Sequence, residues 1–360
     1  MQAELLKKYE PKESGKFEYE RQLWEARFTP CGEFLVAGGY DATIQRWRVT
    51  DESLESLPAM TGHDGWVQTL LPIGGKQLLS GDSWGRVSCW DYSSEQPGKP
   101  LWSIENALGG WIRALAVSPD ESLVAVAGND SKIPLLSVKD GTKQKEFTGF
   151  EDRIFSLAFH PNGKSLVSGD LKGIIREWNL ETGKPNRDLD ASLLYQLNQM
   201  QDSGGVRRLA FDAGGKRLLC GGQKEPGGGF CKGAPQLIVF DWASGKRTHE
   251  VAAGDTQEGF IYDAQFHPDG FVMACASAFP GKGRLFFWRP EDKEPFFTGK
   301  GLTNGRSLSL HPNGKRIAYL VSNSANANGR PLKDGKYAGG SAILRMLDLP
   351  TGESAADENP

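Results

Sequence analysis

Three histidines are the first candidates for chemistry, because imidazole is a common metal ligand and acid–base group. His160, His267 and His311 each stand directly before a proline that opens a short turn. Their recurrence at one place in three distant turns favours a structural role over a metal site. The five cysteines, at positions 31, 89, 220, 231 and 275, follow no metal-binding or disulfide-framework spacing. We therefore predict no metal, no cofactor and no catalytic residue.

Glycine-rich stretches can cradle a phosphate, but here the rest of such a site is missing from the sequence. Gly227-Gly228-Gly229 is not followed by Lys and Ser or Thr, and no Gly-x-Ser-x-Gly or His-Glu-x-x-His motif occurs. The sequence therefore predicts a protein that is not an enzyme. A net charge of −3, from 42 Lys and Arg against 45 Asp and Glu, also disfavours a general nucleic-acid binder.

The composition narrows the fold class. Of 360 residues, 45 are glycine, which argues against a helical bundle, and a hydrophobic content of 38% argues against disorder. No apolar run of about 18 residues is present that could span a membrane. The charged N-terminus lacks the apolar core of a signal peptide. These features predict a soluble protein with no membrane contact, in a reducing, cytoplasmic compartment.

The glycines belong to an internal repeat. A turn of the Pro-x-Gly type precedes an apolar run that ends in small residues, and a second run then closes on a bulky residue, seven times over. Each unit of about 42 residues contains four β-like runs, the pattern of a propeller blade. We predict an all-β, seven-bladed β-propeller of four-stranded antiparallel blades over residues 17–352. It is expected to be monomeric, with tails at 1–16 and 353–360.

The ends of the units resemble the WD-repeat family, to which the β subunits of heterotrimeric G proteins belong. Trp90-Asp91 and Phe240-Asp241, with Gly62-His63 ahead of the first, carry this resemblance, which covers nearly the whole chain. It implies structural roles for the residues at the equivalent repeat positions, which are His63, Trp47, Trp90, Asp91, Trp178, Asp241, Trp288 and Asp348.

The family's structural tetrad joins a loop histidine, a turn aspartate, a serine and the closing tryptophan. The second unit keeps His63, Ser80 and Trp90, but Trp84 occupies the usual aspartate position. We therefore expect no complete tetrad.

Ring closure can also be predicted. The run at 343–349 is a third strand with no fourth strand after it, and the run at 17–23 precedes the first inner strand and has no other partner. We expect the N-terminal run to form the outer strand of the last blade.

Three insertions, at 184–205, 223–236 and 322–342, fall on the same face of such a propeller. Insertions in repeat folds map to one face that often binds partners, although neutral drift of surface loops would also produce them. Within the first, residues 192–200 have apolar spacing compatible with two helical turns.

The inner strands begin on this insertion-bearing face, so their first residues should ring the central opening. These positions resemble the ring of residues that contacts partners in WD-repeat proteins. Trp, Tyr and Arg are also the residues that dominate interface hot spots. The predicted partner-binding residues are Trp24, Trp66, Trp111, Arg113, Arg153, Phe155, Arg207, Phe260, Tyr262 and Arg306. Their arginines suggest an acidic or phosphorylated partner surface, and their aromatic residues leave a methyl-lysine cage as an alternative.

The leading functional hypothesis is a non-enzymatic WD-repeat scaffold that binds one or more protein partners through this face and the central opening. The alternative is a lactonase- or hydrolase-like propeller enzyme with its pocket at the channel mouth. The predicted ring contains no histidine and no acid, which disfavours the enzyme. Nucleic-acid recognition by arginines and stacking aromatics is a third hypothesis, disfavoured by the net charge.

Overall fold

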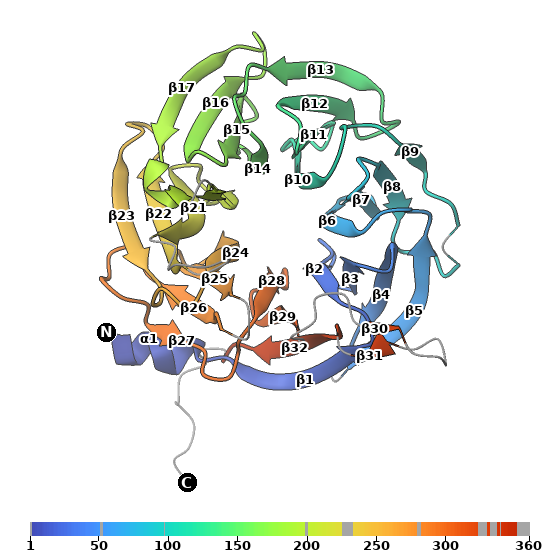
Figure 1. Ribbon diagram of the computed structural model, residues 1–360. Coiled ribbons are helices and arrows are strands. Elements are labelled where there is room, and N and C mark those ends of the chain that lie inside the picture. The colour runs from blue at the N-terminus through green and yellow to red at the C-terminus, as the bar shows by residue number, and fades with distance from the viewer. Residues whose placement is uncertain are drawn as a thin grey trace.

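The computed structural model is a ring of seven four-stranded antiparallel sheets around a central axis (Figure 1). It describes residues 2–50, 53–96, 98–198, 201–224, 233–278, 282–322, 330–331, 337–338 and 340–350. The predicted tail at 353–360, Cys231 and Gly227–Gly229 lie outside these residues. The all-β class and the seven blades are confirmed. No helix in the described part of the chain is long and apolar enough to span the membrane.

Each of the first six blades is a meander in which consecutive strands pair, from the inner strand outwards. Blade 1 consists of β2 (Leu23–Phe28), β3 (Phe34–Gly39), β4 (Thr43–Val49) and β5 (Leu54–Thr61). Blade 2 consists of β6 (Val67–Ile73), β7 (Gln77–Asp82), β8 (Val87–Asp91) and β9 (Trp102–Ile104). Blade 3 consists of β10 (Ile112–Val117), β11 (Leu123–Gly128), β12 (Lys132–Ser137) and β13 (Lys143–Thr148). Blade 4 consists of β14 (Ile154–Phe159), β15 (Ser165–Asp170), β16 (Ile174–Asn179) and β17 (Pro185–Asp190). Blade 5 consists of β20 (Arg208–Phe211), β21 (Arg217–Lys224), β22 (Ala234–Asp241) and β23 (Arg247–Ala252). Blade 6 consists of β24 (Phe260–Phe266), β25 (Val272–Ser277), β26 (Leu285–Trp288) and β27 (Phe297–Thr298).

Blade 7 joins the two ends of the chain, as predicted. Its strands are β28 (Gly305–Leu310), β29 (Arg316–Ser322), β32 (Ala342–Asp348) and, outermost, β1 (Lys12–Tyr19). β1 pairs antiparallel with β32 from Lys12 opposite Asp348 to Tyr19 opposite Ala342, with a register shift between Glu13 and Gly15. The strand therefore starts at residue 12, five residues earlier than the sequence indicated.

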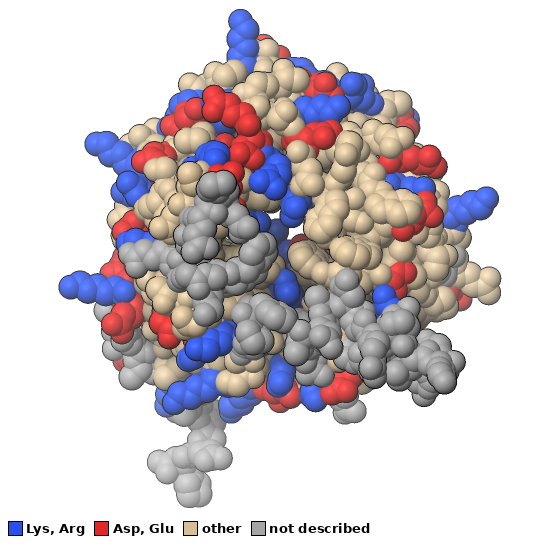
Figure 2. Space-filling model, viewed as in Figure 1, with Lys and Arg blue, Asp and Glu red and all other residues tan. Residues whose placement is uncertain are grey.

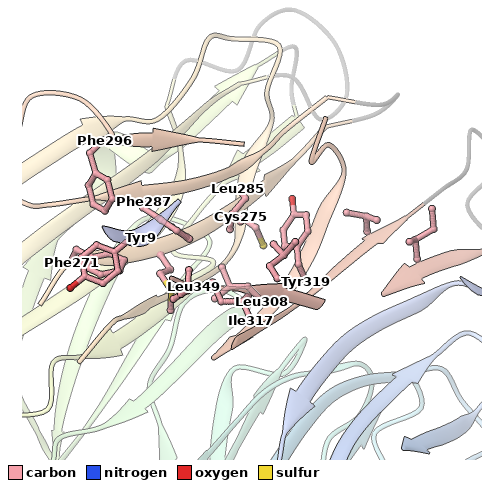
Figure 3. Close-up of a cluster of buried hydrophobic side chains, with 14 residues drawn as sticks. Tyr9, Phe271, Cys275, Leu285, Phe287, Phe296, Leu308, Ile317, Tyr319 and Leu349 are labelled. Atoms are coloured by element: carbon pink, nitrogen blue, oxygen red, sulfur yellow. The ribbon is translucent and has the colours of Figure 1, made fainter. Parts of the chain in front are cut away.

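Residues 1–16 are thus not simply a tail, because helix α1 (Gln2–Tyr9) precedes the strand and lies against blade 6. The anchor is Tyr9, which is 5% exposed and packs with its ring centroid 4.6 Å from that of Phe271 (Figure 3). Its hydroxyl donates a hydrogen bond to Asp269. Burial and that carboxylate raise the pKa of Tyr9. The charged residues around Tyr9 conceal this anchor in the sequence.

Glycines at the end of the second strand let neighbouring blades approach closely. A Cβ placed on Gly81 would lie 2.4 Å from Cγ2 of Ile112, the first apolar residue of the next inner strand. That separation is too short for any side chain, so the position requires glycine. The same contact recurs between blades as Gly38 with Val67, Gly169 with Val206 and Gly221 with Ile261.

The three repeat-turn histidines link neighbouring blades on the opposite face. Nε2 of His160, His267 and His311 lies 2.9, 3.3 and 3.1 Å from the turn carbonyls of Gly215, Gly314 and Gly32. In each case Nδ1 accepts a hydrogen bond from the backbone N–H two residues later, so Nε2 is the donor. Their role is therefore structural, as their repetition indicated.

The expectation that no blade holds a complete tetrad is wrong. In blade 2, His63 Nδ1 lies 2.8 Å from Oδ2 of Asp82, and its Nε2 lies 2.7 Å from Oγ of Ser80. Trp90 Nε1 donates to the same Ser80 oxygen over 2.8 Å. The aspartate is the last residue of β7, two positions before Trp84. Because the turn is tight, its Oδ1 also accepts the backbone N–H of Trp84 at 2.9 Å.

This tetrad leads to a stability prediction with a matched control in blade 4. Burial raises the pKa of Asp82, but hydrogen bonds from His63 and backbone amides outweigh it, so the net pKa is lowered. Asp170 ends β15 at the equivalent position, has no histidine partner, and its pKa is raised by burial. We expect Asp82→Ala to cost about 2–3 kcal/mol in chemical unfolding. Asp170→Ala should cost clearly less, and equal losses would contradict the assignment.

The insertions contain more β structure than expected. Two helical turns were predicted over 192–200, of which 199 and 200 lie outside the described residues. Residues 192–198 do not form them: a 3₁₀ turn η1 (Ser192–Leu194) leads into the hairpin β18 (Tyr195–Asn198) and β19 (Gln201–Gly204). In blade 5, β21 extends to Lys224 and β22 starts at Ala234, so the two ends of the 223–236 insertion are strand. The third insertion carries β30 (Arg330–Pro331) and β31 (Tyr337–Ala338). All three connections lie on one face by topology.

Candidate functional site

The inner strands enclose a central cavity of about 120 Å³. That volume is below the roughly 300–1,000 Å³ of a pocket that holds a whole small molecule. Seven of the ten predicted partner-binding residues line it: Trp24, Arg113, Phe155, Arg207, Phe260, Tyr262 and Arg306. Six of these seven, all except Phe260, hold the same position in their inner strands. Gln68, which is 6% exposed, holds that position in blade 2 and also lines the cavity. The cavity therefore brings together one residue position from every blade.

These side chains form a continuous ring of aromatic faces and guanidinium groups. Arg113 lies 5.1 Å from the ring centroids of both Trp111 and Phe155. Arg207 follows, 4.0 Å from Phe155 and 5.0 Å from Phe260. Cation–π contacts of this kind hold a guanidinium plane against an aromatic face.

The second half of the ring closes through aromatic pairs. Phe260 contacts Tyr262 at 4.7 Å between centroids, and Arg306 lies 4.5 Å from Tyr262 and 5.1 Å from Trp24. Tyr40 then connects Trp24 to Trp66, which lies 4.5 Å from it. The circuit returns to its start because Trp66 and Trp111 are 5.8 Å apart. We call the residues of this circuit the aromatic–arginine ring.

Arg153 is the predicted residue that the structure leaves outside this ring. Its side chain is 46% exposed, and its Nε lies 3.4 Å from Asp152. It still acts on the ring through its charge. Burial, followed by the positive charges of Arg207 and Arg153, lowers the pKa of Arg113 to about 10. Arg113 therefore stays protonated at neutral pH, and it makes no salt bridge with a carboxylate in the described part of the chain.

Beneath the ring lies a buried ion network that the sequence did not reveal. Asp263, 2% exposed, accepts a hydrogen bond from Arg27 Nη1 over 2.6 Å and lies 2.9 Å from Arg208 Nε. Arg27 also pairs with Glu25, whose second oxygen accepts the N–H of Leu70 at 2.5 Å. The network links blades 1, 2, 5 and 6. We call these four charged residues the floor network.

The floor network corrects the expectation that no acid lines the opening, since Glu25 and Asp263 both do. Neither supports the enzyme alternative. Burial raises the pKa of Asp263, but Arg208 and Arg27 outweigh it and hold the carboxyl ionised, with no proton to donate. Both carboxylates are engaged by arginines and form no acid–base pair.

The other chemistry-bearing groups do not line the cavity, although Cys275 pairs with Asp263 between β25 and β24. Cys89, Cys220 and Cys275 are buried free thiols, and burial raises the pKa of Cys89 to about 12, far from a reactive thiolate. Within the described residues, no three His, Cys, Asp or Glu side chains come together in a group that could hold a metal ion.

An uncharged surface adjoins the ring on the insertion-bearing face. Figure 2 looks onto this face and shows Lys and Arg atoms around the central opening, with an uncharged area beside it over β6 and β7. Trp84, in the turn after β7, is 67% exposed, and a Cβ on Gly65 would lie 3.1 Å from Cγ of Trp84. Trp84 is thus next to Gly65, the residue before Trp66 in the chain. The sequence offered Trp84 only as a displaced tetrad position.

The repeat aspartates of the family motif have local structural roles. Asp91 accepts the backbone N–H of Ser93 at 2.8 Å, and Asp241 accepts that of Ser244 at 2.8 Å, so each closes the turn after its strand. Asp348 instead accepts Arg316 Nε at 2.6 Å. Trp90, Trp178 and Trp288 are at most 2% exposed, whereas Trp47 is half-buried against the core of blades 7 and 1.

The fold and sequence together define a class of protein. The family described as "WD domain, G-beta repeat" matches residues 17–48, 98–135 and 141–179. These matches fall in blades 1 to 4, so the chain is a seven-bladed β-propeller in which part of the blades match the WD-repeat model.

Among curated proteins, the chain is similar to the THO complex subunit 6 homolog of Danio rerio, 26% identical over 215 residues. It is also similar to THO complex subunit 6 of Homo sapiens, 25% identical over 216 residues. The match covers 56% of this chain in both cases, and 65% and 62% of those relatives, less than two thirds of their length. An uncharacterized WD repeat-containing protein of Schizosaccharomyces pombe is 30% identical over 156 residues, 41% of each chain.

Proposed function

We propose that this chain is a non-enzymatic WD-repeat scaffold that binds protein partners through its insertion-bearing face and central opening. The observation that carries the proposal is the aromatic–arginine ring, which surrounds a cavity too small for a whole small-molecule ligand. Tryptophan, tyrosine and arginine are the residues that contribute most to protein interfaces. Partly exposed Trp66, Trp111 and Arg113 suit such a role.

We further propose that the chain acts as a monomeric propeller subunit of a THO-type complex. The support is its similarity to proteins named THO complex subunit 6, and their names are the only indication of an assembly. A propeller subunit would contribute surface to such a complex, with no catalysis of its own. The partners in that complex are the expected ligands of the insertion-bearing face.

The relatives give no support to the cytoplasmic location predicted from the sequence. Membership of a THO-type complex would place the chain in the compartment of that complex. Fluorescence microscopy of the tagged chain, imaged beside a tagged subunit of the complex, tests both. Co-localisation outside the cytoplasm would overturn the cytoplasmic prediction, and a purely cytoplasmic signal without co-localisation would contradict membership.

Affinity capture with mass spectrometry tests the binding face. Replacing Trp66, Trp111 and Arg113 together by alanine should deplete the specific partners at least tenfold, since each is a candidate hot spot. The control replaces three exposed lysines of the opposite face by alanine and should leave the partner set unchanged; these are Lys164, Lys216 and Lys315. Circular dichroism checks that both triple variants fold. Retention of every partner by the folded ring variant would refute the site assignment.

A further inference from the structure

The charge of the central cavity is opposite to that of the whole chain. Five arginines and two carboxylates line it, leaving an excess of three positive charges on a protein of net charge −3. The two carboxylates, Glu25 and Asp263, are occupied by Arg27 and Arg208. The excess therefore belongs to the ring above them, which contains Arg113, Arg207 and Arg306.

Two of these guanidinium groups have no carboxylate partner in the described part of the chain. Arg113 donates from Nε to the neutral side chain of Asn129 over 2.8 Å and makes no salt bridge there. Arg306 likewise makes no salt bridge with a described residue, and it lies against the faces of Tyr262 and Trp24. The aromatic faces fix the planes of these groups, and a planar guanidinium held by its face presents its N–H edge to a ligand.

We propose that the arginines of the aromatic–arginine ring bind a phosphoryl group carried by a serine or threonine side chain of a protein partner. This inference rests on the proposed function and names the chemistry of the partner. A phosphomonoester carries about −1.5 to −2 charges and three acceptor oxygens, so it matches several converging guanidinium groups better than one carboxylate does. A cavity of about 120 Å³ suits a single protruding group.

The uncharged surface beside the ring indicates which residues should flank the phosphorylated residue of such a partner. Trp84 is 67% exposed beside Gly65, and Tyr40, Trp66 and Trp111 form an aromatic path that ends at Arg113. An extended peptide with its phosphate at Arg113 would lay neighbouring side chains on this path. Exposed tryptophans gain most from apolar or aromatic contacts. The expected partner segment therefore has apolar residues next to the phosphorylated one.

Binding of degenerate peptides to the full chain tests the inference. The probes are a library with a central phosphoserine between apolar positions, its unphosphorylated counterpart and a glutamate counterpart, with binding followed by tryptophan fluorescence and calorimetry. We expect the phosphorylated library to bind at least tenfold more tightly than either counterpart. Arg113→Gln and Arg306→Gln should each weaken that binding by roughly tenfold. Arg247→Gln, on the outer strand β23 and away from the cavity, is the matched control and should have little effect.

Other outcomes would overturn the proposal. Equal binding of phosphorylated and unphosphorylated libraries, or phosphate-dependent binding that Arg113→Gln and Arg306→Gln leave intact, contradicts it. A single-stranded oligonucleotide that binds as tightly as the phosphopeptide library would replace it by nucleic-acid recognition. Since glutamine at 113 can disturb folding, Arg113→Lys, which keeps the charge and loses the planar fork, must also weaken phosphopeptide binding.

Partner capture separates this inference from the proposed function. Lysate treated with phosphatase before capture should lose the partners that depend on the ring. If those partners still bind wild type and still require Trp66, Trp111 and Arg113, the scaffold proposal stands and the phosphoryl inference fails. If no partner depends on the ring in either lysate, the proposed function itself fails.

Discussion

Removal of residues 1–19 is expected to abolish cooperative unfolding of the whole propeller. β1 supplies the outer strand of blade 7 and pairs with β32 along seven residue pairs. Without it, β32 becomes an open edge and Phe17 and Tyr19 leave the core shared by blades 7 and 1. When the ring opens there, blades 7 and 1 lose their contact with each other, so the destabilisation extends beyond the sheet of blade 7. Calorimetry should replace one sharp transition by a broad one or none.

A shorter deletion provides the control. Removing residues 1–9 takes away α1 and its Tyr9 anchor but leaves β1 paired. Loss of the buried Tyr9 ring from beside Phe271 and Phe296 should cost about 3–5 kcal/mol while a single transition remains. Unchanged melting of the chain that lacks residues 1–19 would show that closure of blade 7 does not hold the ring together.

The fold was predictable because seven units repeat the same physical solution. Each unit carries a turn, a strand ending in a small residue and a bulky closing residue, and the repetition outweighs the noise of any one unit. Close packing of Gly81 on Ile112 gives the physical reason for one recurring glycine. The position of the ring followed from the same register, which is why seven of ten predicted residues line one cavity.

The errors arise where short-range spacing does not decide between alternatives. Leu193, Leu194 and Leu197 fit one side of a helix, but they also fit a 3₁₀ turn followed by a strand. The hairpin forms because Leu194 packs into the core beside Val206 while Tyr195 bonds Asp202 across it over 2.6 Å. Leu197 remains 63% exposed. Such tertiary contacts override the periodicity of a nine-residue stretch.

The tetrad and the floor network were missed for different reasons. Asp82 lies two positions before the family's aspartate position, so a fixed spacing points to Trp84 and overlooks a carboxylate that the tight turn brings to His63. Asp263 and Arg27 are separated by 236 residues and meet beside blade 7, where both bond the backbone of Leu308. Among 45 acids and 42 bases, no sequence pattern singles out that pair.

Asp263→Asn is expected to lower the free energy of unfolding by about 3–5 kcal/mol. The replacement keeps the shape of the side chain but removes its charge and one acceptor oxygen, so the loss reports polar interactions and not a cavity. Arg27 would then keep Glu25 as its carboxylate in the network, and Arg208 would lose the carboxylate it has there. Urea unfolding at neutral pH measures the difference. The control is Asp188→Asn, which breaks a bidentate but 44%-exposed pair with Arg176 and should cost less than about 1 kcal/mol.

The pH dependence and the ligand response give this variant two further signatures. The pKa of Asp263 is lowered, so its contribution to stability is present above the unfolded pKa of about 3.9 and is lost as the pH falls through the folded value. The gap between wild type and Asp263→Asn should therefore stay constant from pH 8 to 5 and close only below about pH 4. Loss of the carboxylate also makes the cavity more positive, so the variant that is least stable should bind a phosphorylated peptide at least as tightly as wild type. If stability and phosphopeptide binding are both lost, Asp263 also shapes the aromatic–arginine ring. The division between a floor network that stabilises the fold and a ring that binds the ligand would then be wrong.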